Sequence, residues 1–138
     1  MRLVTAVITL FLVVGCSQKD PEQMLSSLQG YWEIQKVELP DGEKREFSVN
    51  TTVDYIQWDG ENGKRKKLSP GLNGNYTTSR QTEVFTSEVR AGKLYLLYQT
   101  PYNEWEEQIL AADSTQLVVK NAEGKIYHYR PFETITLD

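Results

Sequence analysis

Short runs of β-branched and aromatic residues, each ended by a tight-turn signal, constrain the fold of this chain more than any other feature. The turn signals include Asp41-Gly42, Asn62-Gly63 and Ala91-Gly92, and such dipeptides favour tight connections between strands. The runs between them cover residues 31–39, 53–58, 76–90, 93–99, 104–111, 115–120 and 125–130. Residues 76–90 are long enough for one strand or for two. About eight short strands in tight succession predict an all-β antiparallel meander, either a barrel or a sandwich.

Side-chain alternation supports the strands but leaves some inner faces open. In residues 93–99 both faces are apolar. In residues 125–130, Tyr127 and Tyr129 share the face opposite Arg130, because successive side chains in a strand point to opposite sides. Full closure into a barrel would remove the exposed edges that an open sheet presents.

A short helix is expected before the first strand. Asp20 can cap it, Pro21 suits the first helical position, and Glu22 suits the positive end of the helix dipole. The helix is predicted to run to about residue 28 and to end before Gly30, because glycine is favoured just after a helix.

Cys16 is the only cysteine of the chain, and it stands where an N-terminal apolar run ends. Met1-Arg2 gives a positive start, residues 3–15 are mostly apolar, and residues 17–20 are polar. A membrane-spanning helix needs about 20 apolar residues, so the run is too short to span. Residues 1–15 are therefore predicted to be a cleaved secretory signal peptide.

The segment Val13-Val14-Gly15-Cys16 resembles the lipobox of bacterial lipoproteins. The resemblance implies that the Cys16 thiol receives a diacylglyceryl group, that cleavage leaves Cys16 first, and that its amino group is acylated, as with palmitate. Residues 16–23 would be the lipidated cysteine and a polar tether, and residues 24–138 the folded domain. The alternative is a cleaved signal with an incidental cysteine.

The expected location is the cell envelope, at the outer membrane, on its periplasmic side or at the cell surface. Residues 17–22 resemble the Lys-plus-acid signal that sends some Bacteroidetes lipoproteins to the outer face of that membrane, although Pro21 interrupts the usual acidic pair. A generic charged linker is the alternative reading of the same residues.

The stretch from Leu28 to Ile34, with Gly30-Tyr31-Trp32 at its centre, resembles the start of the lipocalins. The chain is most similar to the small lipocalin-like lipoproteins of the Bacteroidetes. The resemblance implies a small up-and-down barrel of eight strands, plugged at one end by the preceding helix. It also implies that Arg130, near the end of the last strand, packs across Trp32 and closes the barrel. The polar stretch between residues 64 and 76 argues against a wide ligand cavity.

Composition and residue spacing exclude several classes of chemistry. The net charge of −4 does not suit nucleic acid, which requires a basic surface. With one histidine, His128, and no cysteine besides Cys16, no zinc site is expected. Glu106 and Glu107 should point to opposite faces of a strand, so they cannot share an acid–base site. We therefore expect no metal, no cofactor and no enzymatic activity.

Tyr98, Tyr102 and Trp105 flank a break at Pro101 and are the candidate ligand-binding residues. Aromatic side chains with polar tips can stack a flat or apolar group at a cavity mouth. The alternative is that they are core and strand residues. The basic run of residues 64–67 could bind acidic groups, but a solvated hairpin is the preferred interpretation. The predicted function is binding of a small apolar or amphipathic ligand. The alternative is a non-catalytic accessory protein that docks to an envelope protein and has a filled barrel.

Overall fold

The computed structural model describes residues 19–48, 50–71, 76–78 and 82–133. Within these ranges the chain forms one helix and a succession of strands. They are α1 (Pro21–Ser26), β1 (Gly30–Glu38), β2 (Lys44–Glu46), β3 (Val53–Trp58), β4 (Gly63–Pro70), β5 (Tyr76–Thr78), β6 (Glu83–Arg90), β7 (Lys93–Gln99), β8 (Glu104–Ala112), β9 (Leu117–Asn121) and β10 (Ile126–Pro131).

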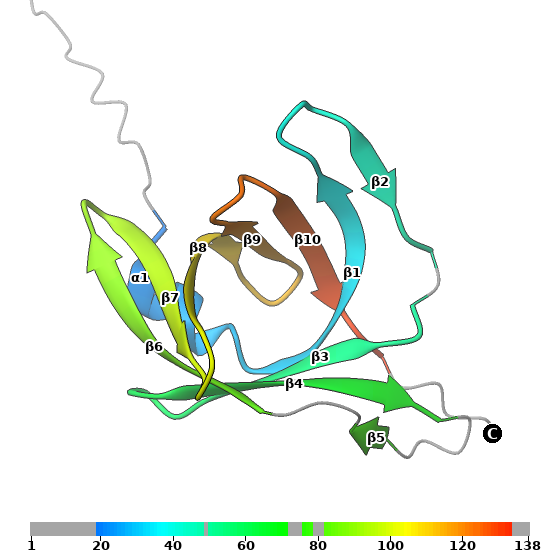
Figure 1. Ribbon diagram of the computed structural model, residues 1–138, viewed down its shortest axis with the longest axis horizontal. Helices are drawn as coiled ribbons and strands as arrows, with labels where there is room; N and C mark the ends of the chain where they lie inside the picture. Colours follow the sequence, from blue (N-terminus) through cyan, green and yellow to red (C-terminus); the bar gives the residue numbers. More distant parts are fainter. Residues whose placement is uncertain (1–18, 49, 72–75, 79–81, 134–138) are drawn as a thin grey trace, which may run out of the picture.

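The strands form a closed antiparallel barrel (Figure 1). The pairing order is β1, β3, β4, β6, β7, β8, β9 and β10, and β10 pairs with β1 again. Strand β2 pairs with β1, and β5 pairs with β4, so both lie outside this ring. Each strand of the ring pairs with the next one in sequence, which confirms the predicted eight-stranded up-and-down barrel and rules out the sandwich.

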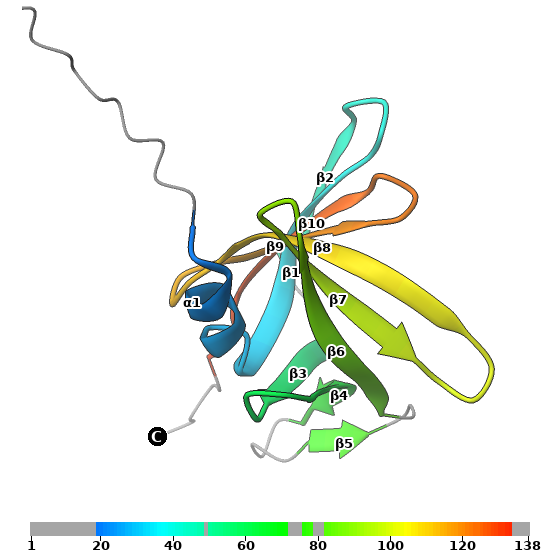
Figure 2. The same cartoon turned by 90° about the vertical axis from the view of Figure 1, so that its left-hand side faces the viewer.

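Helix α1 covers one end of the barrel, which we call the closed end. The Asp20 carboxylate accepts a hydrogen bond from the Glu22 backbone N–H at 3.1 Å, as the sequence predicted. Met24 and Leu25 of α1, with Leu28 after it, are buried in the barrel core. Figure 2 shows that the β1–β2, β7–β8 and β9–β10 turns point away from this end. No helix in the described ranges is long and apolar enough to cross a membrane.

Alternate residues of each strand fill the barrel. The inward rows that the sequence left open are now assigned: Leu94, Leu96 and Tyr98 of β7 are buried, and so is Tyr129 of β10. Irregularities in β1, between Ile34 and Lys36, and in β8, between Ile109 and Ala111, shift the alternation there.

A ladder of rings crosses the barrel wall from β3 to β8. Trp58 stacks on Phe85 with 5.9 Å between ring centroids, Phe85 lies 5.2 Å from Tyr98, and Tyr98 stacks on Trp105 at 5.1 Å. Gly63 makes the ladder possible, because a Cβ built there would lie 2.0 Å from the Phe85 ring. No larger residue can occupy position 63 without displacing Phe85.

Strand β4 corrects the sequence interpretation. Residues 64–67 were expected in a solvated hairpin and the following stretch in an irregular segment, yet residues 63–70 form a strand of the ring. Strand β2 was not predicted either. Residues 76–90 divide into β5 and β6, which confirms the two-strand alternative.

Candidate functional site

The end of the barrel opposite α1 opens into a hollow of about 400 Å³, which we call the mouth. Its wall and floor come from β4, β6, β8 and β10. The residues that define it are Arg65, Lys67, Glu83, Trp105, Glu107 and Tyr127. Ile34 of β1 adds an apolar side chain to the same wall. The mouth therefore combines apolar and aromatic walls with charged groups.

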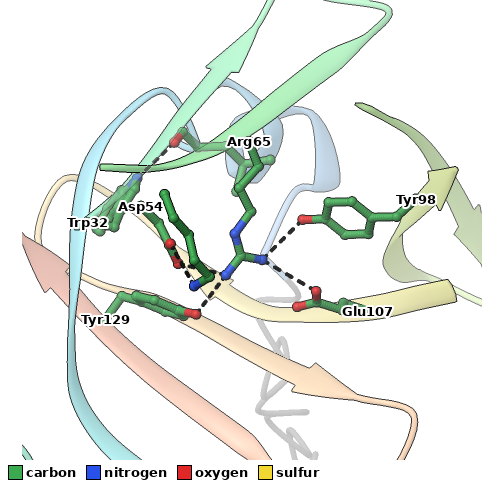
Figure 3. Close-up of polar contacts among 8 residues, drawn as sticks. Trp32, Asp54, Arg65, Tyr98, Glu107 and Tyr129 are labelled. Carbon is green, nitrogen blue, oxygen red and sulfur yellow. Dashed lines mark hydrogen bonds and ion pairs between the residues drawn. The ribbon is translucent and has the colours of Figure 1, made fainter. Parts of the chain in front are cut away.

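Arg65 forms the floor of the mouth and links β4 to four other strands (Figure 3). Its Nη2 donates to Asp54 Oδ2 at 2.7 Å and to the Tyr129 hydroxyl at 2.8 Å. Its Nη1 donates to the Tyr98 hydroxyl and to Glu107 Oε1, both at 3.3 Å. The side chain is only 11% exposed. A charge buried this deeply needs such partners to be tolerated.

Asp54 compensates the two cations of β4 that point into the barrel. Besides Arg65, it binds Lys67 through Oδ1 at 3.0 Å, and it is 4% exposed. Burial acts to raise the pKa of the Asp54 carboxyl, but Arg65 and Lys67 outweigh burial and hold the pKa below its usual value. Asp54 is therefore ionised at neutral pH.

The two tyrosines that accept from Arg65 are neutral hydrogen-bonding partners. Burial raises the pKa of both Tyr98 and Tyr129 well above that of free tyrosine, against the opposing effect of Arg65. Burial opposes the charge of Arg65 itself, but Tyr129, Tyr98, Asp54 and Glu107 together raise its pKa further. The floor thus keeps a fixed charge pattern over the physiological pH range.

Below this floor the barrel is filled. Arg65, Trp32, Leu96 and Leu117 surround a void of about 10 Å³, which is no larger than the space one water requires. A ligand of this barrel would therefore be held in the mouth, above Arg65.

The structure separates the three candidate ligand-binding residues. Tyr98 is a core residue bound to Arg65, and Trp105 is half-buried and lines the mouth. Tyr102 lies in the β7–β8 turn and is 91% exposed. Tyr98 and Trp105 also line an open hollow of about 790 Å³ along β6, β7 and β8. Tyr102 lines neither hollow.

The expected stacking of Arg130 on Trp32 is replaced by other contacts. Arg130 follows the inward Tyr129 and so points outward, where its Nε binds Glu33 Oε1 at 2.7 Å. Trp32 is buried inside the barrel, and its indole N–H donates to the Leu28 carbonyl at 2.8 Å. The two side chains lie on opposite faces of the wall because they differ in strand parity.

Of the other residues that the sequence singled out, His128 and Glu106 lie on the outer surface. His128 Nε2 is 3.4 Å from Glu38 Oε2, and the neighbouring imidazole lowers the pKa of the Glu38 carboxyl. Glu106 binds Arg90 outside the barrel, whereas Glu107 points inward to Arg65. The predicted separation of Glu106 and Glu107 to opposite faces of the strand is confirmed.

In the described part of the chain, no three His, Cys, Asp or Glu residues form a potential metal site. Cys16 and the signal segment lie outside the described residues.

Sequence reasoning missed Asp54, just beneath the mouth, and Glu83, in its wall, and it placed Arg65 and Lys67 in a solvated hairpin. For Asp54 a signal existed, because it shares a strand face with Ile56 and Trp58 and so had to be buried. Arg65 gave no such signal, since its neighbours Lys64 and Lys66 are also cationic and hide the alternation.

Comparison with known proteins identifies the family. A family model described as a lipocalin-like domain matches residues 28–119, and no curated protein sequence matches. Similar solved structures include a lipocalin-like protein from Bacteroides uniformis, with 12% identity over 77% of this chain and 99% of that one and a TM-score of 0.47. An uncharacterized protein from Bacteroides eggerthii has 12% identity over 76% and 99%, with a TM-score of 0.47. Lobster apocrustacyanin A1 has 11% identity over 85% and 71%, with a TM-score of 0.43. On the match to the family model, which covers most of the barrel, this chain belongs to the lipocalin-like domain family.

Proposed function

We propose that this protein is a lipid-anchored envelope protein that binds a small amphipathic molecule in the mouth of its barrel, without catalysing a reaction and without a cofactor. The observation that carries the proposal is the mouth itself, a hollow of about 400 Å³. The aromatic side chains of Trp105 and Tyr127 line its wall, and the charged side chain of Arg65 lies at its floor. Ligand sites typically have volumes of about 300–1,000 Å³ and mix apolar walls with a few polar groups. The lipocalin-like fold is consistent with ligand binding in general.

The depth and chemistry of the mouth favour an amphipathic ligand over a wholly apolar one. The floor offers Arg65 and Glu107, which a hydrocarbon would desolvate without compensation. Trp105 and Tyr127 can cover an apolar segment while the polar end of the ligand stays near the floor or in water.

The binding proposal is tested with the mature protein purified from its own membranes. Native mass spectrometry should reveal a small molecule that co-purifies with the protein. Trp105→Ala and Tyr127→Ala should lose that molecule, whereas Tyr95→Ala, a ring on the outer face of β7 packed against Arg90, should retain it. Tyr102→Ala tests the rim and should have the smallest effect of the mouth-side variants. Retention by Trp105→Ala and Tyr127→Ala, with normal thermal unfolding, would place the ligand elsewhere.

The anchor is the part of the proposal that rests on sequence alone. Two or three acyl chains on Cys16 would hold the protein firmly, since each buried CH₂ contributes about 0.8 kcal/mol. Cys16→Ser should leave the precursor uncut or move the protein from the membrane fraction to the soluble fraction. A variant that is correctly cut and still membrane-bound would rule out the lipid anchor.

The filled barrel below Arg65 favours a second candidate, an accessory protein that docks to another envelope protein. The two candidates differ in what the purified protein carries. A mouth that holds no co-purifying molecule and takes up no added one would favour the accessory role.

A further inference from the structure

We propose that the mouth selects a positively charged amphiphile, with an alkylammonium group held by Glu83 beside Trp105. This inference rests on the proposed binding function and names the chemical class of its ligand. It follows from the charge balance of the inward side chains, from how those charges are already paired, and from the aromatic wall next to them.

The inward charges at the mouth do not cancel. The cations are Arg65 and Lys67, and the carboxylates are Glu83 and Glu107 in the mouth and Asp54 just beneath it. Glu106 and Glu123 also border the mouth, but each is paired outside it, with Arg90 and Lys125 respectively. With Asp54 counted, one negative charge is left without a counterpart among the described residues.

Both cations are already committed to partners inside the protein. Arg65 uses its Nη atoms on Asp54, Glu107 and two tyrosine hydroxyls, and Lys67 binds Asp54 at 3.0 Å. An anionic ligand would have to displace one of these buried partners, leaving a carboxylate unpaired in a poorly solvated place. The one Arg65 donor atom without a partner, Nε, is itself buried, so an anion could reach only Lys67, whose ammonium group already binds Asp54.

Glu83 is the carboxylate that remains available. It is partly buried and lies directly across from Arg65 in the β4–β6 register. It makes no ion pair with any residue in the described ranges. Glu83 and Glu107 both line the mouth, and the charge of each acts to raise the pKa of the Tyr98 hydroxyl.

Trp105 supplies the aromatic surface that an organic cation needs. Its indole lines the mouth and is held in place by stacking on Tyr98, with the two rings 3° from parallel. Cations are attracted to the face of an indole ring, and alkylammonium groups are bound by this combination of rings and carboxylates. A hydrated metal ion gains nothing from such a wall, which is why we infer an organic cation.

The inference is tested with three ligands of equal chain length: hexyltrimethylammonium, hexanoate and 1-hexanol. They are titrated into the mature protein in lipid nanodiscs at low ionic strength, with empty nanodiscs as the blank and tryptophan fluorescence or calorimetry as the readout. We expect the Kd of the cation to be about tenfold lower than that of hexanoate, a difference of about 1.4 kcal/mol. The preference should weaken with added salt.

Glu83→Gln should raise the Kd of the cation toward that of the neutral alcohol and leave the Kd of the alcohol unchanged. Glu61→Gln is the matched control, because Glu61 is an exposed carboxylate in the β3–β4 turn, at the closed end; it should change nothing. If Glu83→Gln does not fold, the comparison of the three ligands on the unaltered protein decides by itself. Equal or tighter binding of hexanoate would overturn this inference and leave the binding function intact, whereas binding of none of the three would overturn both.

Discussion

Arg65 ties the barrel together as a single residue. Its guanidinium contacts side chains from β3, β7, β8 and β10 while its own backbone belongs to β4. Such a buried charge is stabilising only as long as its partners stay in place, because removal of one partner leaves an uncompensated charge. Asp54 is the partner with the shortest contact, at 2.7 Å.

Asp54→Asn should lower the free energy of unfolding at pH 7 by about 3–5 kcal/mol. The pKa of Asp54 is depressed in the folded protein, whereas in the unfolded chain it is about 3.9. Above that value the carboxylate is ionised in both states and its stabilisation is complete. Below it the unfolded state takes up the proton first, so the stabilisation is lost as the pH falls through the folded pKa.

Urea unfolding at several pH values checks this prediction. The gap between the unaltered protein and Asp54→Asn should narrow from about pH 4 downward. Asp41→Asn, in the exposed β1–β2 turn, is the control and should show little loss at any pH. A gap of constant size between pH 7 and pH 3 would mean that the charge of Asp54 is not what stabilises the fold.

At the scale of elements, β1 is the strand on which closure depends. Its first residues pair with β3, its last residues pair with β2, and β10 pairs along its other edge. Inside the barrel this closure buries Trp32, and outside it carries the Glu33–Arg130 ion pair. The two contacts lie on opposite faces of the wall and should act independently.

Trp32→Ala should cost about 3–5 kcal/mol, as large aromatic truncations in cores do. Arg130→Ala should cost about 0–1 kcal/mol, because its ion pair with Glu33 is partly exposed. In a double-mutant cycle Trp32→Ala and Arg130→Ala should be additive, whereas Glu33→Gln and Arg130→Ala should couple. Coupling between Trp32 and Arg130 would show that they interact despite their opposite orientations.

At the scale of the whole molecule, the proposed anchor and the barrel together set an orientation. Cys16 is four residues before the helix cap Asp20, a stretch that spans at most about 14 Å when fully extended. With Cys16 in the bilayer, the closed end would face the membrane. The mouth would face away, so that a ligand would arrive from the aqueous side.

Site-specific fluorophores test this orientation in vesicles with spin-labelled lipids. Ser114→Cys labels the β8–β9 turn at the closed end, and Glu123→Cys labels the β9–β10 turn at the mouth. Quenching should be strong at position 114 and weak at position 123. Equal quenching at the two positions, or stronger quenching at position 123, would contradict the proposed orientation. The lipid anchor is tested separately, by the Cys16→Ser variant.

The sequence by itself determined the local elements and their order. The bounds of β3 and β7 and the Asp20 cap agree with prediction, because turn dipeptides, side-chain alternation and helix caps are properties of neighbouring residues. The resemblance at Gly30-Tyr31-Trp32 indicated the family and with it the eight-stranded barrel. Of the candidate ligand residues, Trp105 lies in the mouth.

Only the tertiary structure decided which charges lie inside. Arg65 is 11 residues from Asp54, 42 from Glu107 and 64 from Tyr129 in sequence. No local pattern records whether those groups will meet. A cation in a strand is exposed unless distant strands bring carboxylates and hydroxyls to it, and barrel closure brings them here. For the same reason the outward direction of Arg130 and the inward direction of Tyr129 were settled by the pairing of β1 with β10. The inner face of a strand is defined by the strands around it, not by its own residues.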